Sequence, residues 1–398
     1  MIDRVRGRHT LEGLLIDPIE GSFPGELVVE DGVIAAIERL EGGAEEPLVF
    51  PGFIDLQVYD PAQLAATGVT GYLLATRTVA AVDDPLCLGL HLEGPFLNPQ
   101  AAGAIPVAEL TPVDLGAVDE WAGAGDLVRL VTLAPELPLA LVAVERLAAA
   151  GIVAALGHTQ ANDLTTRAAL DAGARFATHL WNAMKPPRAR SPGPVLTLLL
   201  DERATIGLIP DGRHLHPLVE ELAVRVAGPG RIALTSDLVP APQERRDGSL
   251  LGGNRSGAAV VGRMARFGLA EAARMASLVP AQVLGLADRG RLAPGYRADL
   301  AILSPDFEPV RTLATYLGAP AHVVVISAAA SEFVHTHGMA ADARAGAGMA
   351  GMDSARPPYG PEISFTHTFA SPGLHKIWGQ FQTHDGQVVT ADFVIQVK

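Results

Sequence analysis

The chain has 398 residues, a hydrophobic content of 48% and a formal net charge of −14. Its length predicts two or three domains, and its acidity argues against nucleic acid or an anionic membrane as the main partner, because both attract basic surfaces. The single cysteine, Cys87, excludes an internal disulfide. No apolar run approaches the roughly 20 residues of a membrane span, and the first residues lack the apolar segment of a secretory signal. We therefore expect a cytoplasmic protein with no membrane span.

Residues 1–50 have the pattern of short strands and turns, with strands predicted at 26–29 and 33–37 around a hairpin turn. From residue 51 onward, apolar runs alternate with stretches of helical period, such as 139–149 and 163–172. Eight strands are predicted, at 53–56, 71–74, 88–92, 128–133, 152–156, 174–178, 205–209 and 232–235. This rhythm over residues 51–290 predicts a (β/α)8 TIM-like barrel, with a doubly wound open sheet as the alternative.

The last part of the chain follows a different pattern. After a short strand at 298–303, residues 306–398 show alternating apolar segments at 322–326, 363–369 and 393–397, and a loop rich in Gly, Ala, Met and Pro at 339–358. Such alternation is typical of a small β-sandwich. We therefore expect three parts. They are a small β-domain (1–50, completed in part by 291–305), a metal-dependent hydrolase barrel (51–290) and a β-sandwich-like tail (306–398).

Three metal-ligating residue types follow three predicted barrel strands. Glu93 ends one apolar run, and His158 and His179 end two others, 21 residues apart. Because the carboxyl ends of parallel strands meet at one face of a barrel, these side chains are expected to converge there. A salt bridge is the simpler interpretation of Glu93 alone. Together the three residues predict a site for one divalent ion, most consistent with Zn²⁺.

Further polar residues follow later strands. Asp237 suits the proton transfers of a hydrolytic mechanism, although an N-cap explains it equally well. His214 has the chemistry to polarise a carbonyl, and Arg190 to bind a phosphate through two hydrogen bonds. Taken alone, both are more simply surface residues of loops.

Several of these residues lie in motifs that together resemble the N-acetylglucosamine-6-phosphate deacetylases of the amidohydrolase superfamily over about residues 10–310. The matching pieces are PGFIDLQ at 51–57, HLEGPF at 91–96, LAPE at 133–136, GHT at 157–159, ATHLWNAM at 177–184, DGRH at 211–214, TSD at 235–237 and GRLAPGYRAD at 290–299. The second and fifth pieces together are the most specific.

The resemblance implies a reaction and roles for individual residues. Glu93, His158 and His179 fall on the metal ligands of the family. Asp237 falls on the general acid/base, and His214 on the residue that contacts the scissile acetamide. The implied reaction is hydrolysis of N-acetylglucosamine 6-phosphate to glucosamine 6-phosphate and acetate.

The resemblance also implies how a sugar phosphate is held. Asn182 and Ala183 fall on contacts to this substrate. Arg190 falls on the arginine that reaches the phosphate in the neighbouring subunit, which implies a homodimer.

The sequence departs from the family pattern around these residues. Where many amidohydrolases have His-x-His and bind a second metal ion, this chain has Gln57 and Tyr59, and Tyr59 stands near an asparagine of single-metal members. Ile105 stands where some members have a substrate-binding histidine, and the loops after residues 60 and 237 look short. Two alternatives therefore stay open. One is an inactive relative acting as a scaffold or binding protein, and the other is a deacetylase for another N-acetyl amino sugar.

The tail resembles small sandwich domains of exported or membrane-associated bacterial proteins. It holds six of the 12 histidines and several methionines, and these residue types favour soft metals such as copper. Composition alone is the simpler explanation of their number. The residues are His322, His335, His337, His367, His375, His384, Met339, Met349 and Met352.

Overall fold

The computed structural model describes residues 8–42, 46–64, 67–240, 243–244, 250–253, 255–307, 313–314, 321–327, 333–340, 363–365, 367–369, 372–383 and 388–397. Within these residues, no helix combines the length and apolar character needed to cross a membrane. The chain divides into two compact units. One consists of residues 15–23 and 49–301, and the other of residues 1–14, 24–48 and 302–398.

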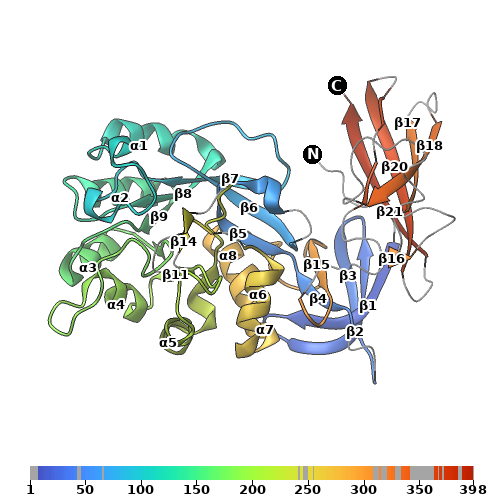
Figure 1. Cartoon of the computed structure of the whole chain (residues 1–398), viewed down its shortest axis with the longest axis horizontal. Helices are drawn as coiled ribbons and strands as arrows, with labels where there is room; N and C mark the ends of the chain where they lie inside the picture. The colour runs from blue at the N-terminus through green and yellow to red at the C-terminus, as the bar shows by residue number, and fades with distance from the viewer. Residues whose placement is uncertain are drawn as a thin grey trace. The chain divides into compact units, whose positions relative to one another are not determined.

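An eight-stranded parallel sheet forms the centre of the first unit (Figure 1). Its strands pair in chain order, and a bridge from Leu238 to Val58 joins the region after the last strand to the first strand. This confirms the predicted barrel. The strands are β5 (Phe53–Val58), β6 (Val69–Thr76), β7 (Cys87–Glu93), β8 (Val128–Leu133), β9 (Val153–Leu156), β10 (Phe176–Ala177), β11 (Thr205–Leu208) and β12 (Ile232–Leu234).

Helices lie outside these strands (Figure 1). They are α1 (Leu115–Ala122), α2 (Ala140–Ala149), α3 (Asp163–Asp171), α4 (Gly193–Leu200), α5 (Pro217–Ala227), α6 (Ala258–Met264), α7 (Leu269–Ala273) and α8 (Val279–Val283). Local sequence fixes where they begin. Asn162, for example, accepts a hydrogen bond from the amide of Thr165 and so caps α3.

A buried apolar cluster joins barrel strands to helix α8 and the residue that follows it. The cluster consists of Ile54, Leu56, Leu73, Leu130, Ala155, Phe176, Ala233, Val279, Ala281 and Leu284. After β12 the chain forms a short antiparallel pair, β13 (Gln243–Glu244) and β14 (Leu250–Leu251), so the region beyond Asp237 retains a small hairpin.

A five-stranded sheet contains the predicted N-terminal hairpin. Its order is β15-β4-β1-β2-β3. The strands are β1 (Arg8–Asp17), β2 (Gly21–Glu30), β3 (Val33–Arg39), β4 (Leu48–Pro51) and β15 (Leu300–Leu303). β2 and β3 pair antiparallel, as predicted.

The described residues of the tail form a six-stranded sheet in which the pairings are antiparallel. Its strands are β16 (Leu313–Ala314), β17 (Ala321–Ser327), β18 (Phe333–Ala340), β19 (Ile363–Ser364), β20 (Gly373–Thr383) and β21 (Val388–Val397). Among the described residues of the segment predicted at 363–369, the first two are in a strand. Most of the loop predicted at 339–358 lies outside the described residues. The three-part division of the chain stays a prediction.

Candidate metal and catalytic site

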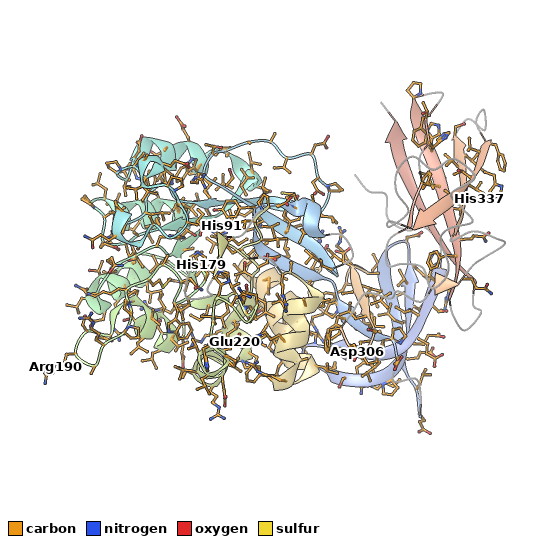
Figure 2. All side chains as sticks on the ribbon, viewed as in Figure 1. His91, His179, Arg190, Glu220, Asp306 and His337 are labelled. Carbon is orange, nitrogen blue, oxygen red and sulfur yellow. The ribbon has the colours of Figure 1, made fainter. Side chains whose placement is uncertain are left out.

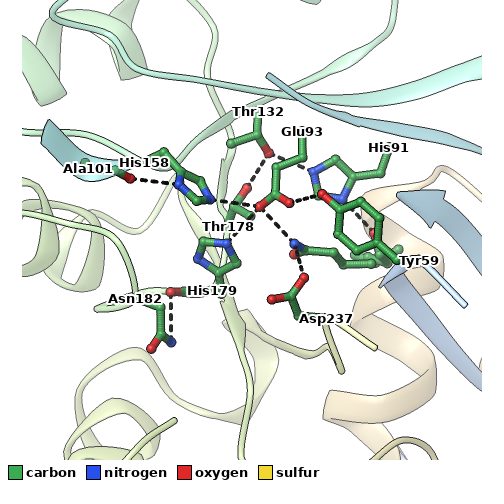
Figure 3. A network of polar contacts seen from close by, with 12 residues as sticks. Tyr59, His91, Glu93, Ala101, Thr132, His158, Thr178, His179, Asn182 and Asp237 are labelled. Carbon is green, nitrogen blue, oxygen red and sulfur yellow. Dashed lines mark hydrogen bonds and ion pairs between the residues drawn. The ribbon is translucent and has the colours of Figure 1, made fainter. Parts of the chain in front are cut away.

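The ends of strands β7, β9 and β10 bring Glu93, His158 and His179 together, as the sequence predicts (Figure 3). All three are buried, and their ligand atoms lie within 4.8 Å of one another. Oε1 of Glu93 lies 3.0 Å from Nε2 of His158 and 2.8 Å from Nε2 of His179. Within the part of the chain that the structure describes, this is the only group of three such residues arranged to hold a metal ion.

The backbone is strained at this strand-end face. His158, His179 and Asp237 have φ angles of 47°, 30° and 49°, in the left-handed region that non-glycine residues seldom adopt. Such conformations cost about 1–3 kcal/mol each and persist only where the surrounding structure fixes them. Strain of this kind is found most often at functional sites.

Glu93 accepts hydrogen bonds through both carboxylate oxygens. Nε2 of Gln57 donates to Oε1 over 2.9 Å, and the Tyr59 hydroxyl donates to Oε2. Burial alone would raise the pKa of Glu93, but its contacts with His158 and His179, which are strongest when those rings carry a second proton, outweigh it and hold the pKa well below its ordinary value. The carboxylate is therefore ionised, the form that binds a metal ion.

The donor set fits a divalent metal ion. Nδ1 of His158 lies 2.8 Å from the carbonyl oxygen of Ala101, so it carries the proton and leaves a lone pair on Nε2. That lone pair and Oε1 of Glu93 would repel at 3.0 Å without a cation or proton between them. The buried Nδ1 of His179 has no hydrogen-bond partner among the described residues. Two imidazoles and one carboxylate are a ligand set that suits zinc.

His91 supports the site from within the barrel. Its Nδ1 lies 2.9 Å from the carbonyl oxygen of Leu56, and its Nε2 lies 2.7 Å from the hydroxyl of Thr132, which in turn lies 2.7 Å from the hydroxyl of Thr178. Burial lowers the pKa of His91 to about 4, so the ring is neutral. This chain of bonds ties together strands β5, β7 and β8 and the end of β10.

Asp237 lies beside the ligands, at the end of β12. Its Oδ1 accepts a hydrogen bond from Nε2 of Gln57 over 2.9 Å, so one amide group holds both Asp237 and Glu93. Burial, with repulsion from Glu93 and Asp55, raises the pKa of Asp237 well above its ordinary value. A carboxyl group that changes protonation nearer neutral pH is suited to general acid and base catalysis. The structure gives it no capping role.

His214 is held in one orientation by Asp211. Oδ2 of Asp211 lies 2.9 Å from Nδ1 of His214, and Oδ1 accepts from the amides of Arg213 and His214. Burial would raise the pKa of Asp211, but the bonds from His214 and Arg213 lower it. The ionised carboxylate keeps the proton on Nδ1, so Nε2 is the nitrogen left for a ligand.

These residues line a cavity of about 520 Å³. Besides the three ligands, its wall includes Asp237, His214, Asn182, Ala183, Tyr59 and Ile105. Arg77 is the one arginine or lysine on the wall among the described residues. Arg190 is exposed at the tip of an outer loop and is not part of the wall (Figure 2).

Three residues that lie at or beside the site in the structure have no role predicted from the sequence. Asp211 and Arg77 both lie in loops, outside the helices and strands. Glu136 accepts hydrogen bonds from Asn98, the hydroxyl of Thr159 and the amide of Gln160, which fixes the backbone beside the second ligand strand. A usable signal existed for Asp211, because an Asp three residues before a His can bond both its amide and its ring. No signal placed Arg77, since it follows a strand that carries no ligand.

The tail histidines do not form a comparable group within the described residues. The rings of His335 and His337 lie 5.5 Å apart between centroids, and His375 is buried against Phe369. His384, Met349 and Met352 lie outside the described residues, as do the side chains of His322 and Met339. The copper hypothesis gains no support from this arrangement.

Comparison with known proteins identifies relatives of the whole barrel. A profile of the Amidohydrolase family matches residues 135–326, and a profile of a domain of unknown function (DUF8832) matches residues 284–398. N-acetylglucosamine-6-phosphate deacetylase of Lysinibacillus sphaericus is 30% identical over 69% of this chain and 88% of its own length. N-acetylgalactosamine-6-phosphate deacetylase of Escherichia coli O157:H7 is 32% identical over 75% of this chain and 94% of its own length.

Solved structures agree with these sequences. A mutant N-acetyl-D-glucosamine-6-phosphate deacetylase of Mycobacterium smegmatis, in complex with N-acetyl-D-glucosamine-6-phosphate, superposes with a TM-score of 0.69 and 29% identity. The match covers 76% of this chain and 96% of that one. Sequence and fold thus agree over nearly the full length of these relatives, and the chain belongs to the N-acetylglucosamine-6-phosphate deacetylase family of the amidohydrolase superfamily.

Proposed function

We propose that this protein is a metal-dependent deacetylase that hydrolyses N-acetylglucosamine 6-phosphate to glucosamine 6-phosphate and acetate. One observation carries the proposal. Glu93, His158 and His179 converge beside Asp237 on the wall of one cavity. The names of the relatives supply the substrate, and the site supplies the groups that amide hydrolysis requires.

The residues that would hold the metal ion are Glu93, His158 and His179, and Zn²⁺ is the ion that best suits one carboxylate and two imidazoles. When bound, such an ion activates water and polarises a carbonyl. Glu93 supplies the negative charge of the site, and its low pKa keeps that charge over the physiological range.

Asp237 would move the proton. Its carboxylate takes a proton from the attacking water and delivers it to the nitrogen of the acetamide as the C–N bond breaks. Gln57 orients the carboxylate through Oδ1, which leaves Oδ2 for the proton. His214, fixed by Asp211, would present Nε2–H or its lone pair to the acetamide or to a sugar hydroxyl.

Asn182 and Ala183 would contact the sugar phosphate from the wall of the cavity. Arg190 would act in the cavity of a neighbouring subunit, because it lies outside its own. Arg77 offers a cation within the same chain. Its Nε bonds Glu109 over 2.5 Å, and no hydrogen bond to the described residues uses its two terminal nitrogens. The homodimer and the cytoplasmic location stay predictions.

Acetate release from N-acetylglucosamine 6-phosphate by the zinc-loaded protein tests the proposal. Glu93→Gln is expected to abolish both bound zinc and activity, and Asp237→Asn to keep zinc and lose most activity. Glu221→Gln makes the same chemical change at an ion pair on α5, outside the cavity, and should behave like the parent. A parent protein that binds zinc but releases acetate from neither this sugar nor N-acetylgalactosamine 6-phosphate would support the hypothesis of an inactive relative.

A second candidate substrate is N-acetylgalactosamine 6-phosphate. The Escherichia coli relative with this specificity is matched over 94% of its length. The two substrates differ only in the configuration of one ring hydroxyl, and the metal-facing groups act on the acetamide that they share. The ratio of kcat/KM for the two sugars decides between them.

A further inference from the structure

Tyr59 makes a contact that its position in the family pattern does not predict. It directly follows strand β5, and its hydroxyl bonds Oε2 of Glu93 (Figure 3). Its backbone amide donates to the carbonyl oxygen of Leu238 over 2.8 Å, so the end of the strand is anchored where the barrel closes. The backbone of Tyr59 is thus held in place, and within the described residues its hydroxyl has one hydrogen-bond partner, Glu93.

The two oxygens of Glu93 have separate surroundings. Oε1 faces His158 and His179, whereas the Tyr59 hydroxyl is the hydrogen-bond partner of Oε2 within the described residues. Gln57 does not donate a hydrogen bond to Oε2, because its Nε2 donates to Oε1 and to Asp237. Removal of the Tyr59 hydroxyl would therefore leave a buried carboxylate oxygen without its donor.

We propose that Tyr59 is a positioning residue for the metal site, which holds Oε2 of Glu93 so that the carboxylate presents a single oxygen, Oε1, toward the two histidines. A carboxylate fixed by a second hydrogen bond loses less freedom when it binds a cation and cannot swing to a two-oxygen arrangement. The inference rests on the proposed metal site and not on the identity of the substrate.

Tyr59→Phe tests this role because it removes one hydroxyl and keeps the ring. The variant is expected to bind zinc roughly 10–100-fold more weakly, the usual cost of losing an outer partner of a ligand. Competition against a chromophoric chelator measures the dissociation constant without any turnover. Tyr72→Phe is the matched control, because the Tyr72 hydroxyl bonds Asp84 over 2.7 Å and Tyr72 is not part of the cavity wall.

An unchanged zinc affinity in Tyr59→Phe, or an equal loss in Tyr72→Phe, would overturn the proposal. Thermal unfolding of the metal-free variants separates affinity from folding. Tyr59→Phe should unfold cooperatively and gain less stability than the parent on adding zinc. A tyrosinate band that appears in the ultraviolet spectrum when the parent binds zinc would also overturn it, since Tyr59 would then be ligating the ion itself.

Enzyme assays keep this inference distinct from the proposed function. A weaker zinc site in Tyr59→Phe supports the positioning role even if the parent releases no acetate. If the parent is active, saturating zinc should restore most of the kcat of the variant, because the lost hydroxyl acts through Glu93 and not on the substrate. A kcat that stays low at full metal occupancy would contradict the positioning role.

Discussion

Nδ1 of His214 lies 2.9 Å from Oδ2 of Asp211, in a loop where Asp211 is otherwise occupied by backbone amides. The pair fixes both the ring orientation and the tautomer of His214. A histidine that faces the cavity is thus prepared for one kind of contact before a ligand arrives.

Asp211→Asn should lower kcat/KM for the sugar phosphate by roughly 10–100-fold while zinc content stays at the parent level. The amide keeps one oxygen for the backbone bonds but turns an NH2 donor toward Nδ1, which can no longer hold its proton in that hydrogen bond. Steady-state kinetics and metal analysis check this, with His214→Gln as the reference for complete loss of the imidazole. An Asp211→Asn variant with parental kinetics would show that the pair is only structural.

The raised pKa of Asp237 predicts the pH dependence of stability in the metal-free protein. The native state holds this proton more tightly than the unfolded state, so stability falls as pH rises from about 3.9, the ordinary carboxyl value, through the raised native pKa. Asp237→Asn should therefore be more stable than the parent at neutral pH and closer to it at acid pH. Chelator-treated samples melted across this range give the comparison. A stability difference between Asp237→Asn and the parent that grows toward acid pH would contradict this prediction.

Arg77→Gln should weaken competitive inhibition by inorganic phosphate by roughly 10-fold or more, the value of one charged hydrogen bond. Arg146→Gln, at an exposed ion pair with Asp119, provides the matched control and should leave inhibition unchanged. If Arg190→Gln removes the inhibition and Arg77→Gln does not, the phosphate is bound by the neighbouring subunit.

Gly157→Ala should destabilise the barrel beneath the second metal ligand. An added Cβ would lie 2.7 Å from Cγ2 of Thr132 and 3.0 Å from Cβ of Thr178, both in the buried chain of bonds around His91. Overpacking of this kind costs about 1–3 kcal/mol. Denaturant unfolding measures it, and Gly230→Ala, where nothing lies within 4 Å of the new atom, should have little effect.

The strands and the metal group were accessible from sequence because each ligand ends an apolar run. Strand β8 has the predicted bounds, Val128–Leu133. Strand β10 is shorter than predicted, because the chain turns at His179 into a left-handed conformation. Strand β20 was not predicted, since polar and apolar residues occupy both of its faces and its pairing with β17 and β21 defines it.

The remaining parts of the site depend on contacts between distant segments. Asp211 and Arg77 reach the cavity through loop geometry, which periodicity does not encode. In the sequence, Gln57 and Tyr59 stand where many amidohydrolases have metal-ligating histidines, and only Tyr59 looked unusual for a single-metal site. In the structure both side chains donate hydrogen bonds to Glu93, so each helps to hold this carboxylate in place.

The closure of the barrel offers a local measure of how firmly Asp237, the proposed catalytic base, is held. Leu238, next to Asp237, accepts hydrogen bonds from the amides of Tyr59 and Asp60 and forms a bridge with Val58. Opening of the barrel at this junction would expose those two amides and would at the same time release the carboxyl group of Asp237. Hydrogen exchange at the amides of Tyr59 and Asp60 therefore reports how often the Asp237 carboxyl group, the proposed proton-transfer group, leaves its position in the protein without substrate.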